Sequence, residues 1–164
     1  MLWLTILSRW VHIGSAITMV GGSVFLRLVL MPAAQALPEA DHNTLRLRIM
    51  SRWKKVVHSC VLLFLLSGFY NFIVVTMPLH KGDKMYHALI GIKILLALVV
   101  FFFAIALTSS KSWSEGLRRK SGQWLAVNLM LATVIVAISG VLKNMPATSG
   151  PKAAAAVQPE KPAE

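Results

Sequence analysis

The sequence predicts an all-α fold, an integral membrane four-helix bundle, and two observations carry this prediction. The chain of 164 residues is 56% hydrophobic with a mean hydropathy of +0.66, which is too apolar for a soluble domain of this length. It also contains four apolar runs that are each long enough to cross a hydrocarbon core of about 30 Å, which takes about 20 helical residues. These runs cover residues 10–31, 56–77, 88–109 and 124–142.

The basic residues between these runs predict the orientation of the bundle. The connection after the first run contains Arg46, Arg48, Arg52, Lys54 and Lys55, and the one after the third contains Lys111, Arg118, Arg119 and Lys120. The connection after the second run contains only Lys81 and Lys84. Since short loops rich in Lys and Arg stay in the cytoplasm, we expect the first and third connections inside and both termini outside. We expect the protein to lie in the inner membrane of a bacterium. This topology accounts for the net charge of +11 without nucleic acid as a partner.

The first run has an alternative interpretation as a cleaved signal peptide, with Ala34, Gln35 and Ala36 as the cleavage site. The run is longer than the apolar part of most signal peptides, and it contains Arg27. Cleavage would also place the basic first connection outside, against the positive-inside bias. We therefore predict that the run is retained as a helix.

Two segments are expected to lie outside the four helices. Residues 38–55 carry Leu45, Ile49 and Trp53 at a spacing of four in a basic sequence, which predicts a short amphipathic cytoplasmic helix or an extension of the second helix. Residues 146–164 are rich in Pro and Ala and predict a disordered tail. The sequence thus divides into a membrane domain over residues 1–145 and this tail.

Small and polar residues inside the apolar runs predict contacts between helices. Gly14, Thr18 and Gly22 recur at a spacing of four, which favours close approach of helix backbones. Four polar residues are interpreted as interhelical hydrogen-bonding groups, namely Ser67, Asn71, Asn128 and Ser139.

Two cations lie within the apolar runs, where charge is costly and either serves a function or reaches the headgroups. Arg27 is about four residues from the inner end of its run, so its long side chain can extend to the headgroups. Lys93 lies deeper, in "ALIGIKILLALVV". For Lys93 the sequence leaves two alternatives open, extension to the headgroups or pairing with an anionic group such as a carboxylate or a propionate.

Three of the five histidines are predicted to share the outer side of the membrane, namely His12, His80 and His87, while His42 and His58 fall on the inner side. Met77, Met85 and Met145 lie at the same outer level. Imidazole and thioether ligands suit copper, and two imidazoles on facing helices can hold a b-type haem. His42 and His80 are expected to be solvated loop residues.

The sequence also resembles two groups of small membrane proteins. "WVHIGSAITMVGGSVFLRLVLMP" resembles the first helix of the CopD-type copper-resistance proteins, and its early His12 and "FLRLV" resemble the HemJ-type protoporphyrinogen IX oxidases. "IMSRWKKVVHSCVLLFLLSGFY" is similar to the second helix of the HemJ-type proteins, and Lys93 matches a lysine early in the third helix of both groups. This CopD/HemJ-like resemblance covers residues 8–108; where the HemJ-type proteins have a histidine two residues before that lysine, this chain has Gly91.

The resemblance and the histidines together give three functional expectations. The first is a haem b protein that supports redox chemistry or electron transfer, with His12 and His87 as axial ligands, Lys93 near a propionate and Arg27 as a further cofactor contact. If it is an enzyme, it would be an oxidoreductase of the protoporphyrinogen oxidase type, working with a membrane redox partner or as a homo-oligomer. The second is copper handling or uptake through His12, His87, His80 and Met77. The third is a non-catalytic accessory subunit whose polar residues serve packing.

Overall fold

The predicted all-α four-helix bundle is confirmed by the computed structural model, which describes residues 2–146; within that range all regular structure is helical. The bundle consists of α1 (Leu2–Phe25), α3 (Glu39–Tyr70), α4 (Lys84–Thr108) and α6 (Ser121–Asn144). Each of the four, with the short helical turns that continue α1 and α3, is long and apolar enough to cross a membrane. Apart from Pro146, the predicted tail lies outside the described residues.

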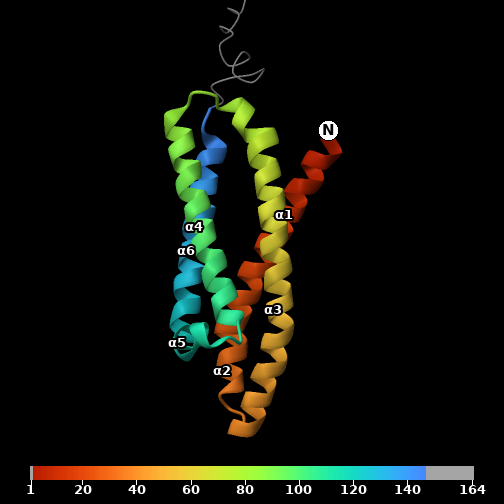
Figure 1. Cartoon of the computed structure of the whole chain (residues 1–164), viewed down its shortest axis with the longest axis vertical. Helices are drawn as coiled ribbons and strands as arrows, with labels where there is room; N and C mark the ends of the chain where they lie inside the picture. Colours follow the sequence, from red (N-terminus) through yellow and green to blue (C-terminus); the bar gives the residue numbers. More distant parts are fainter. Residues whose placement is uncertain (1, 147–164) are drawn as a thin grey trace, which may run out of the picture.

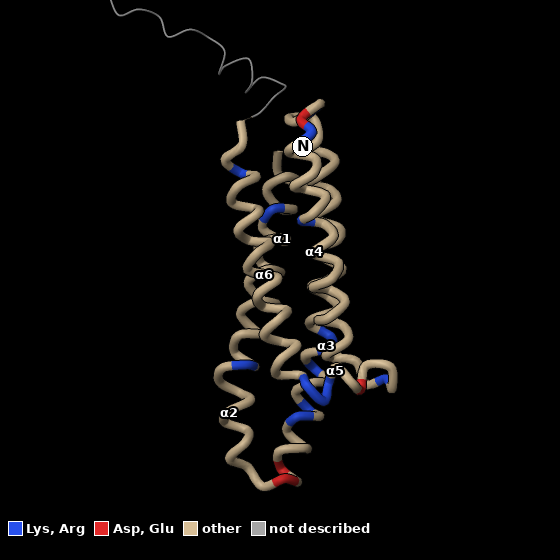
Figure 2. Tube along the Cα trace, turned by 90° about the vertical axis from the view of Figure 1, so that its left-hand side faces the viewer, with Lys and Arg blue, Asp and Glu red and all other residues tan. Residues whose placement is uncertain are grey.

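The four long helices alternate in direction, so the connection from α1 to α3 and the connection from α4 to α6 lie at one end of the bundle, and the connection from α3 to α4 lies at the other (Figure 1). α1 packs on α3, α4 packs on α6, and smaller contacts between α3 and α4 and between α1 and α6 close the ring. The start of α1, the α3–α4 connection and the end of α6 lie at one end, which we call the terminal end. Figure 2 shows Lys and Arg concentrated at the opposite end, around α5 (Glu115–Arg119) and the first half of α3. We call this the basic end; its position on the cytoplasmic side stays a prediction.

Residues 39–55 form the first half of α3, so of the two alternatives the extension of the second helix is confirmed and the separate amphipathic helix is wrong. Pro38 has an extended backbone (φ −53°, ψ 147°) and directly precedes the first helical residue. Glu39 and Asp41 lie in the first turn, where negative charge interacts favourably with the helix dipole. Because no Pro or Gly interrupts residues 39–67, the hydrogen-bond ladder continues from the basic segment into the apolar one.

Two of the long helices end in widened turns. α1 continues as a π-helical segment, Leu26–Leu30, and then as α2 (Met31–Ala34), while α3 continues as a π-helical segment, Asn71–Thr76, and a 3₁₀ turn, Met77–Leu79. Both π segments lie just before a proline, Pro32 or Pro78. A proline has no N–H and clashes with the carbonyl four residues earlier, so a widened turn accommodates it without ending the helix.

The bundle has a small core in its middle, formed by Met19, Val57, Cys60, Val61 and Ala104. Many larger apolar side chains, including Leu66 and Leu95, face outward, as expected for helices surrounded by lipid. Of the small residues predicted to pack α1, only Gly22 contacts another helix closely: the ring of Trp53 occupies the space that a Cβ atom would take. Gly14 and Thr18 face outward.

Candidate functional site

His12 on α1 is held in one orientation by α3. Its Nδ1 atom lies 3.0 Å from Oγ of Ser67. The ring of Phe64 meets the imidazole edge-on at a centroid distance of 4.9 Å. Gly68 also lies beside the imidazole, since a Cβ atom at that position would lie 3.5 Å from Cε1 of His12, in ordinary van der Waals contact. The hydrogen-bond contact with Ser67 and the ring contact with Phe64, both from α3, therefore orient the imidazole.

The hydrogen bonds of Ser67 determine which nitrogen of His12 carries the proton. The Ser67 hydroxyl has a single hydrogen, and it donates this hydrogen to the carbonyl of Leu63, one turn earlier, at 2.6 Å. Toward His12 the hydroxyl must then accept, so Nδ1 of His12 carries the hydrogen. Nε2 is left with an available lone pair, the form in which histidine binds metals and accepts protons.

Lys93 on α4 lies within electrostatic range of His12 and is partly buried. Within residues 2–146 its ammonium group has neither a hydrogen bond nor a salt bridge. A cation inside an apolar span is costly unless an opposite charge or water compensates it. We call His12 and Lys93, with Ser67, Phe64 and Gly68 behind the imidazole, the His12–Lys93 site.

Further polar atoms in the bundle are buried without a partner in the described part of the chain. They are the hydroxyl of Tyr70 and the side-chain oxygens of Asn71 and Asn128. Asn71 is one helical turn beyond Ser67 and so on the same face of the chain. Of the four predicted interhelical hydrogen-bonding residues, Ser67 makes such a bond, whereas Ser139 bonds the carbonyl of Ile135 on its own helix at 2.7 Å.

At the terminal end, His80 is buried and not solvated, so that expectation is wrong. Its ring stacks on Tyr86 at a centroid distance of 3.7 Å and is 7% exposed, because the turn at Gly82 (φ 83°) folds the α3–α4 connection back onto the start of α4. Nδ1 of His80 is buried and has no hydrogen-bond partner within residues 2–146. His87 meets Tyr86 edge-on at 6.2 Å.

The residues predicted to bind one cofactor fall into three places. His12 and Lys93 share a site, whereas His87 lies six residues before Lys93 on α4, about 9 Å nearer the terminal end. Arg27 is 15 residues after His12, about 22 Å along the helix, and packs against Gly122 of α6. Met77, the proposed thioether ligand, is 47% exposed. Among the described residues, no three His, Cys, Asp or Glu side chains are grouped as a metal site.

The His12–Lys93 site has a defined chemical preference. An imidazole with a free Nε2 lone pair can ligate a metal or accept a proton. The nearby ammonium favours a ligand that also carries negative charge and disfavours a bare metal cation. Comparisons with protein-family models, with curated proteins and with solved structures found no match for this chain. Its function is therefore inferred from this geometry and from the residues themselves.

Proposed function

We propose that this membrane protein binds a b-type haem at the His12–Lys93 site and supports redox chemistry or electron transfer. One observation carries the proposal: Ser67 orients His12 with a free Nε2, within electrostatic range of a lysine that has no counter-charge among the described residues. In this assignment His12 binds the iron and Lys93 neutralises a propionate. When bound, a haem supplies one-electron redox chemistry; the protein holds and orients it.

Two further features support the assignment. In a metal-bound histidine, the ring nitrogen that does not bind the metal usually donates a hydrogen bond to a neighbouring group. The bond from Nδ1 of His12 to Ser67 is of this kind. The resemblance of residues 8–108 to the CopD-type and HemJ-type proteins favours a cofactor site on the helices that carry His12 and Lys93. His87 stays the predicted second ligand. Because it lies nearer the terminal end than Lys93, its role has to be tested independently of that of His12.

A copper-handling function has weaker support from the geometry. A copper ion at His12 would place a second positive charge near Lys93. In the described part of the chain no carboxylate is grouped there to offset the repulsion. A haem brings its own propionates, so the same lysine stabilises it. For this reason we place haem before copper, and copper before a purely structural role for His12.

The proposed location is the inner membrane of a bacterium, with the basic end in the cytoplasm. The support is the concentration of Lys and Arg at the end that carries α5 and the first half of α3. The His12–Lys93 site would then lie in the outer half of the membrane.

The proposal is tested by the visible spectrum of the detergent-purified protein, oxidised and then reduced with dithionite, with iron and copper quantified in the same sample. The protein should be expressed with haem and copper supplied. We expect a Soret band, and α and β bands that sharpen on reduction. His12→Ala should lose this spectrum, while Lys93→Gln should keep the coordination but bind haem more weakly.

The matched control is His58→Ala, which removes an exposed histidine on α3 whose Nδ1 faces the Lys54 carbonyl at 2.7 Å. It should retain the full haem content. Unchanged haem in His12→Ala, with the variant still monodisperse, would exclude His12 as the ligand. Copper without haem would shift the assignment to copper handling, and neither group in any preparation would leave His12 as a structural residue of an accessory subunit.

A further inference from the structure

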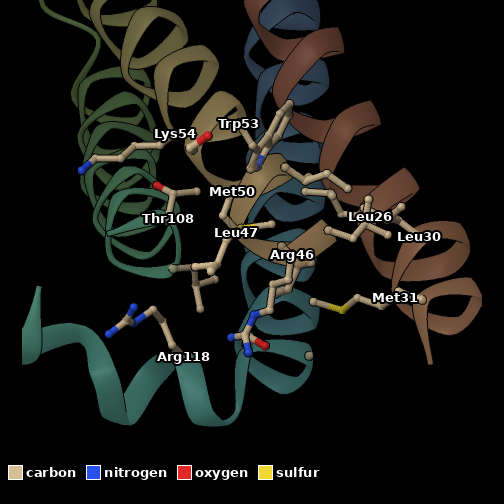
Figure 3. A pocket seen from close by; sticks show the side chains of 18 of the residues that line it. Leu26, Leu30, Met31, Arg46, Leu47, Met50, Trp53, Lys54, Thr108 and Arg118 are labelled. Carbon is tan, nitrogen blue, oxygen red and sulfur yellow. The ribbon is translucent and has the colours of Figure 1, made fainter. Parts of the chain in front are cut away.

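A large cavity lies at the basic end of the bundle, away from the His12–Lys93 site. Its volume is about 1160 Å³, and its walls come from the π-helical segment Leu26–Leu30 with α2, the first half of α3, the end of α4, α5 and the start of α6. This is more than the roughly 300–1,000 Å³ of most small-molecule pockets. We call it the basic cavity (Figure 3).

One part of the basic cavity is apolar. Its lining includes Leu26, Leu30, Met31, Leu47, Met50 and Trp53. In Figure 3, Leu26 and Leu30 come from the α1 side, and Met50 and Trp53 face them from α3. Leu47 is 73% exposed although it belongs to this wall, so the wall continues onto the outer surface of the bundle. A soluble anion would leave this apolar surface uncovered.

The other part of the lining is cationic. It includes Arg27, Arg46, Lys54, Lys55, Arg118 and Arg119, whereas Glu115 is the one acidic residue that lines the cavity in the described part of the chain. Within residues 2–146, Glu115 forms no salt bridge with any of them. In Figure 3 the guanidinium groups of Arg46 and Arg118 lie beyond the apolar side chains, toward α5. The cavity therefore combines an excess of positive charge with an apolar wall.

Arg118 has free hydrogen-bonding capacity at this place. Its Nε is buried and has no acceptor among the described residues, and its Nη2 makes one long bond of 3.5 Å to the carbonyl of Lys111. A guanidinium group binds phosphate through two parallel N–H donors, so an anion near Arg118 would satisfy the buried Nε.

We propose that the basic cavity binds an anionic membrane phospholipid. The phosphodiester lies against Arg46 and Arg118, and the first part of the acyl chains lies along Leu47, Met50 and Trp53. Basic pockets between membrane helices on the cytoplasmic side favour anionic headgroups in this way. The site is in the other half of the bundle from His12, and it does not depend on haem binding.

The test is native mass spectrometry of the full chain in detergent with added phosphatidylglycerol or phosphatidylcholine. We expect the parent protein to retain phosphatidylglycerol in preference to phosphatidylcholine. The double variant Arg46→Gln with Arg118→Gln should lose at least about tenfold in affinity for phosphatidylglycerol, because each cation near the headgroup contributes to binding. Inorganic phosphate at the same concentration should not displace the lipid; displacement would assign the site to soluble phosphate and overturn the lipid assignment.

The matched control is Arg48→Gln with Arg52→Gln, which also removes two positive charges at the basic end, from the half of α3 that carries Arg46, at two residues that do not line the basic cavity. This control should keep the preference. Equal losses of phosphatidylglycerol affinity in both double variants would show general attraction of the lipid to a basic surface and would overturn the assignment to the cavity. Met50→Trp provides a second test that preserves every charge: it fills part of the cavity and should also reduce phosphatidylglycerol binding, whereas unchanged binding would overturn the proposal.

Discussion

Nδ1 of His12 and Oγ of Ser67 lie 3.0 Å apart and join α1 to α3 by a hydrogen bond inside the membrane-spanning part of the bundle. The same hydroxyl donates to the Leu63 carbonyl at 2.6 Å, and Ser8 on α1 donates to the Ser67 carbonyl at 3.2 Å. Polar side chains of α1 thus meet both the side chain and the backbone of Ser67. Because the Ser67 hydroxyl accepts from His12, the proton position on the imidazole is determined by α3 and not by solvent.

Ser67→Ala should weaken haem binding while leaving α3 intact, because alanine is a good helix former and Nδ1 of His12 loses the one side-chain partner that it has within residues 2–146. Loss of such a supporting hydrogen bond typically costs about 10- to 100-fold in the affinity of a metal site. Haem titration of the apoprotein measures this change. The control is Ser139→Ala, whose hydroxyl bonds its own helix; equal affinities in the two variants would show that Ser67 does not orient the ligand.

The same substitution has a readout that does not involve haem. Nitrogen NMR of the apoprotein labelled at histidine should show His12 with the proton on Nδ1 in the parent chain. In Ser67→Ala we expect a mixture of the two neutral forms. A parent protein with the proton on Nε2 would contradict the hydrogen-bond direction assigned to Ser67.

Gly22→Ala should destabilise the bundle, because the added Cβ would overlap the indole ring of Trp53. Overpacking of this kind typically costs about 1–3 kcal/mol in the free energy of unfolding. The adjacent Gly21 has open space at its Cβ position, so Gly21→Ala should be neutral or stabilising by up to about 1 kcal/mol through helix propensity. Unfolding in mixed SDS micelles compares the two variants; equal stability would show that the Trp53 ring moves aside without cost and that Gly22 is not needed for the packing.

The number of helices and the arrangement of their ends were predictable because they depend on long segments. Hydropathy over about 20 residues identifies each span, and the charges of whole connections identify the basic end. The rotation of each helix was not predictable in the same way. The four spans are apolar on most faces, so the sequence does not show that Gly22 contacts Trp53 while Gly14 faces outward.

The site was predictable in part for the same reason. His12 and Lys93 stand out as polar groups in apolar runs, and the structure brings them within electrostatic range. Ser67 was interpreted as a packing residue, although its spacing of four from Leu63 permits the backbone hydrogen bond that sets the proton on His12. The burial of His80 depends on a left-handed turn at Gly82, and the basic cavity depends on five segments meeting at one end. A linear pattern contains neither.

Asp83→Ala should destabilise the start of α4. The Asp83 side chain accepts a hydrogen bond from the backbone N–H of Tyr86 at 3.0 Å, which satisfies one of the free donors in the first turn. Removing such a cap typically costs about 1 kcal/mol in the free energy of unfolding. Asp83→Asn is the control, since asparagine caps helices about equally well; a loss of the same size in both variants would indicate that the charge and not the cap is responsible.

The orientation of the bundle can be tested with single cysteines at its two ends. Lys84, the first residue of α4, is exposed at the terminal end, and Gly116 in α5 has open space at its Cβ position at the basic end. Because the basic end is predicted to lie in the cytoplasm, a membrane-impermeant maleimide should label Lys84→Cys in intact cells and Gly116→Cys only after permeabilisation. The native Cys60 is buried and should not be labelled in intact or permeabilised cells. The parent chain, which contains only this cysteine, is the control. The opposite labelling pattern would place the basic cavity outside and the His12–Lys93 site in the cytoplasmic half, so the lipid that reaches the cavity would come from the outer leaflet.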